Sequence, residues 1–224
     1  MERKISFAIG EYYHIYNRGV EKRNIFTNDS DYKRFNKLLF VANGTEAFSY
    51  RDLKDKKLSE IDRGKQLVAI GAYCQMPNHF HILVKEIKKG GISLFMEKFT
   101  TGYSKYFNKK YDRVGALFQG RFKAQHVNRD EHLKYLFSYI HLNPMKIIEP
   151  KWKEKKINNI EKAENFLQNY KYSSFSDYTG VKREENVILS PKEFPKYFLS
   201  VNEFKDFIKD WIKFGVEKEE LKNS

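Results

Sequence analysis

The sequence has one cysteine, Cys74, and no long hydrophobic run. A single thiol excludes an internal disulfide, and its place in an apolar stretch is typical of a small core residue. No stretch approaches the ~18 apolar residues of a membrane span. The charged first residues lead into a strand-like stretch and not into the hydrophobic segment of a secretory signal. We therefore expect a soluble, cytoplasmic protein without a membrane partner.

Positive charge is abundant, with 42 Lys and Arg against 29 Asp and Glu in 224 residues. The net charge of +13 favours a polyanionic partner, because neutralising phosphates releases counterions. Aromatic residues make up 16% of the chain and would offer stacking surfaces for unpaired bases. A lysine-rich proteome gives the same composition, so composition alone favours nucleic acid only modestly.

The spacing of apolar residues predicts the order strand, helix, strand, strand, helix, strand, helix. The predicted strands cover 12–18, 67–76, 79–85 and 115–127, the last one straight or bent into a hairpin at Gly120. The predicted helices cover 29–43 and 94–111, and a third opens with a capping box at Asn128 and ends at the Asn143-Pro144 step. This order predicts an α+β domain, an antiparallel sheet with helices packed on it.

Composition divides the chain at about Pro150. We expect one domain over 1–150, with a polar surface insertion at about 45–66. Residues 151–224 form a predicted C-terminal extension, with an amphipathic helix at about 202–214.

Two histidines stand at the start of a predicted strand. Side chains two residues apart share one face of a strand, so His79 and His81 project together while Phe80 and Ile82 face a core. Two adjacent imidazoles can bind one divalent ion. The alternative is a pair of unrelated surface histidines, or one core histidine and one stray, and the spacing alone leaves this open.

A second pair, Tyr139 and Asn143, lies four residues apart on one face of a predicted helix. A phenol has a pKa of about 10 and is a poor nucleophile unless its transition state is stabilised. A metal held by His79 and His81 could supply that stabilisation, with the Asn143 carbonyl as a third ligand. The alternative for Tyr139 is a half-buried aromatic that packs the helix edge.

The ordered motifs resemble the single-tyrosine HUH transposases and, within them, the REP-associated tyrosine transposases. The matching segments are YHIYNRG (13–19), Phe26, DYKRF (31–35), MPNHFH (76–81), GALFQGRFK (115–123), YIHLNP (139–144) and YSS (172–174). They cover roughly residues 10–180 in the family's order. Each motif alone is weak evidence for the family, whereas the ordered set is specific. With this resemblance, a metal site becomes the favoured interpretation of His79 and His81.

The resemblance implies roles for four residues. Tyr139 matches the nucleophile, His79 and His81 match the metal-binding pair, and Asn143 matches the polar residue that completes the metal site. It also implies a ferredoxin-like (HUH endonuclease) fold over 1–150, one Mg²⁺ or Mn²⁺ ion, a hairpin-forming single-stranded DNA substrate, and a monomer or homodimer. After Asn143-Pro144 the chain reads Met-Lys-Ile, where Val-Arg-Ala is expected, which puts local DNA contacts in doubt.

Several basic residues are candidates for phosphate contacts, which need positive charge but no fixed spacing. They are Arg18, Arg121, Lys123, Lys105 and Lys109. Solvated surface charge is an equally good interpretation of each. His14, on the first predicted strand, is interpreted as a structural residue that could also line the sheet near the histidine pair.

The sequence therefore predicts a transposase that nicks single-stranded DNA beside a hairpin, holds the 5′ end on Tyr139, and rejoins it to a 3′ hydroxyl. One alternative is a domesticated hairpin-binding protein or repressor without cleavage. Another is an HUH replication initiator or relaxase. The sequence leaves open whether Tyr139 acts on the histidines of its own chain or of a second copy.

Overall fold

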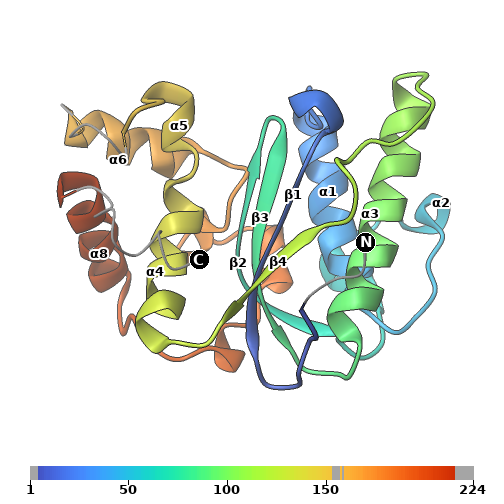
Figure 1. The fold of residues 1–224 in the computed structure, drawn as a ribbon, viewed down its shortest axis with the longest axis horizontal. Coiled ribbons are helices and arrows are strands. Elements are labelled where there is room, and N and C mark those ends of the chain that lie inside the picture. The colour runs from blue at the N-terminus through green and yellow to red at the C-terminus, as the bar shows by residue number, and fades with distance from the viewer. Residues whose placement is uncertain (1–4, 153–156, 158, 215–224) are drawn as a thin grey trace.

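The computed structural model describes residues 5–152, 157 and 159–214 and has a four-stranded antiparallel sheet at its centre (Figure 1). The strands are β1 (Tyr12–Arg18), β2 (Val68–Met76), β3 (His79–Glu86) and β4 (Lys123–Val127). Their spatial order is β2-β3-β1-β4, so β1 and β3 are central and β2 and β4 are edges. The predicted antiparallel α+β fold is confirmed.

Helices cover both faces of the sheet (Figure 1). The helices α1 (Asp29–Val41) and α3 (Gly91–Lys110) lie on one face, and α4 (Asp130–Leu142) lies on the other. The remaining helices are α2 (Tyr50–Leu53), α5 (Met145–Ile148), α6 (Ile160–Asn169), α7 (Phe175–Tyr178) and α8 (Val201–Phe214). The 3-10 turns are η1 (Val20–Lys22), η2 (Leu58–Glu60), η3 (Glu184–Ile188) and η4 (Pro191–Glu193).

Strand alternation divides the core between the two faces of the sheet. Phe80, Ile82 and Val84 are fully buried in the cluster beneath α1 and α3. Leu83 faces the other way and packs in the cluster with Leu133 and Phe137 of α4. The polar side chains of β3 that alternate with the first set therefore lie on the α4 face.

The predicted strand over 115–127 is too long. Only β4 (Lys123–Val127) is a strand, and before it a single bridge joins Phe118 to Gly19. Leu117 and Phe118 are both buried in the same cluster, so their side chains do not alternate. Gly120 adopts a φ of 70°, a left-handed conformation that turns the chain and interrupts pairing.

The predicted start of α4, and the reason given for its end, need correction. The N-cap is Arg129, one residue later than predicted, and it makes no side-chain capping bond. The helix ends at Leu142 as expected, but Asn143 keeps helical angles (φ −54°, ψ −38°). Pro144 is the N-cap of α5, where proline is tolerated because its missing N–H would have no partner in the helix.

The extension packs on α4 and covers the β2 edge. Side chains from α6 and α8 share a buried cluster with Tyr135 and Leu142 on the outer side of α4. Backbone bonds of 2.9 Å run from Gln75 N to the Tyr172 carbonyl and from Ser174 N to the Tyr73 carbonyl. The predicted helix at 202–214 is confirmed as α8, and the predicted insertion contains α2 and η2.

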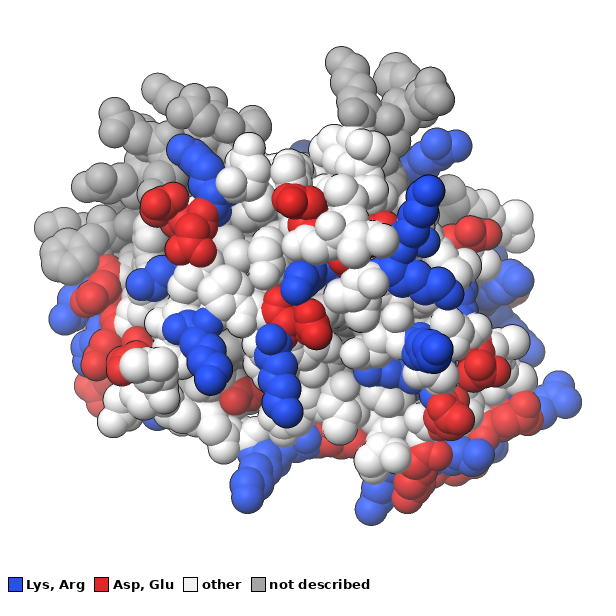
Figure 2. Space-filling view, turned by 90° about the horizontal axis from the view of Figure 1, so that it is seen from below, with Lys and Arg blue, Asp and Glu red and all other residues white. Residues whose placement is uncertain are grey.

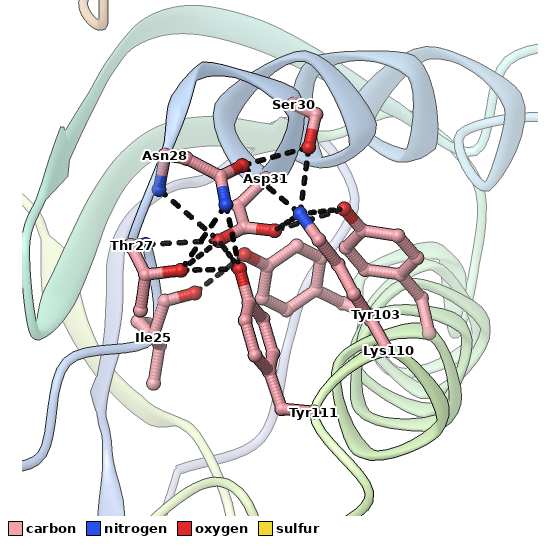
Figure 3. Close-up of polar contacts among 9 residues, drawn as sticks. Ile25, Thr27, Asn28, Ser30, Asp31, Tyr103, Lys110 and Tyr111 are labelled. Atoms are coloured by element: carbon pink, nitrogen blue, oxygen red, sulfur yellow. Dashed lines mark hydrogen bonds and ion pairs between the residues drawn. The ribbon is translucent and has the colours of Figure 1, made fainter.

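A buried carboxylate joins the start of α1 to the end of α3 (Figure 3). Asp31 is fully buried and accepts bonds from Thr27, Tyr106 and Tyr111. Lys110 Nζ lies 2.6 Å from its Oδ1.

Within the described part of the chain, no helix is long and apolar enough to cross a bilayer.

Candidate active site

The two histidines of β3 lie side by side on the α4 face of the sheet. Their ring centroids are 5.1 Å apart, with the rings edge to face. His81 is buried and His79 is half-buried at the start of the strand, where Arg18 of β1 is its pairing partner. The predicted common face of His79 and His81 is thus observed.

Tyr139 comes from α4 to the same place within the same chain. Its ring centroid lies 5.6 Å from that of His81 and 5.7 Å from that of His14. The apolar stripe of α4 docks Leu136 and Ile140 on the sheet, which leaves Tyr139 half-buried at the edge of the helix. One copy of the chain therefore brings together the phenol and the imidazoles.

Asn143 is fully buried one turn after Tyr139. Its Nδ2 donates to the Tyr139 carbonyl at 2.7 Å, while its Oδ1 is buried with no hydrogen-bond partner among the described residues. Buried polar atoms are rarely left without a partner unless they have a ligand or a role. An amide oxygen is a suitable ligand for Mg²⁺, so Asn143 fits the third position that the resemblance implies.

This donor set is two imidazoles and one neutral oxygen. Among the described residues there is no cluster of three His, Cys, Asp or Glu side chains that could bind a metal. A metal at this place would therefore rest on His79, His81 and Asn143, with water or phosphate oxygens in the remaining positions.

Electrostatics favour a neutral imidazole and a protonated phenol. Burial, followed by the charges of Lys146 and Arg18, lowers the pKa of His79 to about 4, which leaves its lone pair available at neutral pH. Burial raises the pKa of Tyr139, and Tyr16 adds to this rise, whereas the Asn143 side chain opposes it. Nucleophilic attack by Tyr139 would therefore need help in removing its proton.

Sequence reasoning did not identify Lys146 as a site residue. It follows Asn143 by three positions, on α5, and is half-buried close enough to His79 to influence its pKa. Burial lowers the pKa of Lys146 itself. The available signal was its place in the motif, where the resembling family was expected to carry arginine.

The five basic residues predicted to contact DNA divide between the two faces of the sheet. Lys123 pairs with Tyr16, whose ring lies 5.8 Å from His81, so Lys123 and Arg18 lie near the histidines. Lys105 and Arg121 instead line a groove of about 1400 Å³ beside α3. Lys109 is exposed on α3.

Comparisons with known proteins agree with this architecture. The family model described as "Transposase IS200 like" matches residues 9–143. A solved structure of a REP-associated tyrosine transposase bound to a REP hairpin aligns with a TM-score of 0.51 and 14% identity, over 83% of this chain and 90% of that one. At such identity the likeness concerns the fold, and no curated protein matches the sequence. Because the family model covers more than half of the chain, this protein belongs to the IS200-like transposase family.

Proposed function

We propose that this chain is a metal-dependent tyrosine endonuclease and strand transferase that acts on hairpin-forming single-stranded DNA. The observation that carries the proposal is the convergence of Tyr139 with His81 in one chain. One turn away, the buried Asn143 oxygen has no hydrogen-bond partner among the described residues. The similar structure bound to a REP hairpin supports this class of substrate.

The chemistry is an exchange of phosphodiesters. The Tyr139 oxygen would attack the phosphorus, the bond to the 3′ oxygen would break, and the released 3′ hydroxyl would gain a proton while the phenol loses one. One divalent ion on His79, His81 and Asn143 would polarise the phosphate and stabilise the leaving oxygen. Attack by a 3′ hydroxyl on the phosphotyrosine would then rejoin the strands and restore the phenol.

Two cations beside His79 fit a phosphate at this site. Arg18 and Lys146 both lower the pKa of His79, so both place positive charge near the imidazole pair. Positive charge repels a metal ion but attracts the phosphate that would accompany it. We propose that these side chains hold the scissile phosphate.

A covalent-adduct assay tests the proposal. Incubating labelled hairpin DNA with the protein and Mn²⁺ should give a slow-migrating band on a denaturing gel. Tyr139→Phe should abolish this band and spare hairpin binding. Tyr135→Phe is the matched control, because Tyr135 lies one turn earlier on α4, and it should retain the band.

Two further results bear on the proposal. Metal chelation, or alanine at His79 and His81, should also abolish the band. A Tyr139→Phe protein that still forms adducts would contradict the role of Tyr139, and cleavage that persists in EDTA would contradict the metal site. Tight hairpin binding by the unchanged protein without any adduct would favour a binding protein that does not cleave.

A further inference from the structure

We propose that His14 and Asn78 are positioning residues that hold His81 and His79 in the Nδ1–H tautomer, so that the Nε2 lone pair of each imidazole is presented to one cation. This inference rests on the metal site proposed above. It assigns a role to two residues that do not themselves bind the metal.

The first half of the inference comes from the contact between His14 and His81. His14 Nε2 lies 2.9 Å from His81 Nδ1, and the two rings stack with centroids 5.1 Å apart. This hydrogen bond occupies His81 Nδ1, so a cation that binds this imidazole must bind it through Nε2. A metal-binding nitrogen must offer a lone pair, so the ring proton belongs on Nδ1 and donates to His14 Nε2.

The second half comes from the contact between Asn78 and His79. Asn78 Oδ1 lies 2.6 Å from His79 Nδ1. An amide oxygen only accepts, so His79 must donate from Nδ1 and keep its lone pair on Nε2. The other end of the same amide, Nδ2, donates to the Lys22 carbonyl at 3.2 Å, which fixes the orientation of the amide. The two contacts therefore place the ring proton on Nδ1 in both imidazoles, with His14 as the acceptor for His81 and Asn78 as the acceptor for His79.

The fold builds this arrangement from the pairing of β1 with β3. Tyr16 is the register partner of His81, so His14, two residues away on β1, lies diagonally from His81 on the same face. Only 5% of the His14 surface is exposed, which protects the hydrogen bond from competition by water. Asn78 lies in the tight turn immediately before β3, so the turn itself supplies the partner of His79.

Such partners matter because they orient a metal-binding ring and raise its basicity. Removing one typically weakens metal binding 10- to 100-fold. A role limited to packing makes a different prediction, because an aromatic ring of similar size would then substitute for His14.

The test compares His14→Phe with His14→Gln. Phenylalanine keeps the ring but cannot accept a hydrogen bond, whereas the glutamine oxygen can take the place of Nε2. Mn²⁺ affinity of the DNA-free protein, measured by electron paramagnetic resonance, should fall about 10- to 100-fold in His14→Phe and recover to within a few-fold in His14→Gln. The matched control His126→Phe alters an exposed histidine of β4 that bonds Glu11, and its affinity should not change.

A second pair of variants tests the turn. Asn78→Asp keeps an acceptor oxygen beside His79 and should bind Mn²⁺ at least as well as the unchanged protein. Asn78→Leu removes the acceptor and should weaken binding by the same order as His14→Phe.

A readout without metal separates this inference from the proposed function. Nitrogen-15 NMR of the metal-free protein at pH 8 reports the tautomer of each neutral imidazole. His79 and His81 should both carry the proton on Nδ1, and His81 should lose this preference in His14→Phe. A protein with both tautomers as expected but no Mn²⁺ binding would refute the metal site and leave the positioning intact.

The inference is overturned if either imidazole of the unchanged protein carries its proton on Nε2. It is also overturned if His14→Phe binds Mn²⁺ as tightly as the unchanged protein. The tautomer measurement needs no substitution, so a variant that fails to fold does not remove the test.

Discussion

Tyr139 is one of 15 tyrosines, and its surroundings set it apart. Tyr73 and Tyr103 are fully buried in the core, and burial holds the pKa of each far above the ordinary value. Tyr139 is half-buried and meets two imidazoles edge-on. At the residue scale, the candidate site is therefore a half-buried phenol in contact with the imidazoles of His14 and His81.

Replacing Lys146 tests the proposed contact with the scissile phosphate. We expect Lys146→Met to slow adduct formation about 10- to 100-fold, because a hydrogen bond to a charged group contributes about 1.5–3 kcal/mol. Lys146→Arg restores the positive charge, and arginine is the residue expected at this place in the motif, so it should recover most of the rate.

The measurement is a single-turnover adduct assay at saturating Mn²⁺. Equal rates for Lys146→Met and the unchanged protein would show that the side chain does not touch the phosphate.

At the element scale, polar contacts join segments that are distant in sequence. The Asp31 cluster ties the first turn of α1 to the last residue of α3 (Figure 3). Both helices cover the same face of the sheet (Figure 1). The hydrogen bonds to Asp31, with Lys110 among the donors, outweigh burial and lower its pKa to about 2. The Asp31 cluster therefore stabilises the helices on the face of the sheet opposite the candidate site.

Asp31→Asn should destabilise the fold by about 2 kcal/mol at pH 7, because the charged acceptor is lost. The carboxylate has a lower pKa in the folded chain than its ordinary 3.8, so its contribution is present above that value. It is lost as the pH falls from about 4 to about 2, where the folded form takes up its proton.

Urea unfolding of both proteins at several pH values measures this difference. The two free energies of unfolding should converge as the pH falls toward 2. A constant difference across this range would contradict the assigned role of the carboxylate.

A second set of polar contacts between distant segments lies at the β2 edge. Ser174 Oγ lies 2.7 Å from His141 Nε2, accepts from Tyr73 N at 2.9 Å, and donates to the Tyr73 carbonyl at 3.2 Å. These contacts fasten the YSS motif to both the sheet and α4. An uncovered strand edge invites pairing with another chain, so this motif has a structural function that the resemblance did not reveal.

We expect Ser174→Ala to lower the free energy of unfolding by about 1–3 kcal/mol, because three buried polar groups lose a partner. Thermal unfolding measures the loss. Adduct formation per folded molecule should stay within a few-fold of the unchanged protein, since the hydrogen bonds of the Ser174 hydroxyl go to Tyr73 and His141.

At the scale of the whole molecule, the charged residues behind the net charge of +13 do not form one uniformly positive surface. On the face seen from below, lysine and arginine lie among aspartate and glutamate (Figure 2). The end of β1 and the start of β3 lie at the upper end of the sheet in Figure 1, and Arg18 and His79 are the register partners at these two strand ends. We therefore expect the cations near the histidines to dominate DNA binding.

Salt dependence tests this expectation. Arg18→Ala and Lys123→Ala should each reduce the slope of log K against log salt by about 0.7, the value for one phosphate contact to single-stranded DNA. Lys88→Ala is the matched control, because Lys88 is exposed just beyond the far end of β3. Equal effects of all three substitutions would show that binding depends on the net charge alone.

Much of the fold was predictable because it depends on local periodicity. Alternation predicted which side of β3 carries His79, and the helical repeat predicted that Tyr139 and Asn143 share a face. The failures at 115–122 and at Asn128 have a common cause. The turn at Gly120 and the exact N-cap of α4 depend on contacts with other segments. The spacing of apolar residues carries no information about such contacts.

The sequence by itself determined the order of the elements, the shared face of the β3 histidines, and the motifs that indicate the family. Only the tertiary structure decided that Tyr139 meets His81, that His14 bonds to His81, and that the charge of Lys146 is near enough to His79 to lower its pKa. These residue pairs are separated by 58 to 67 positions in the sequence. Their distances depend on how α4 docks through Leu133 and Phe137 against Leu83, and packing of that kind is a property of the folded chain.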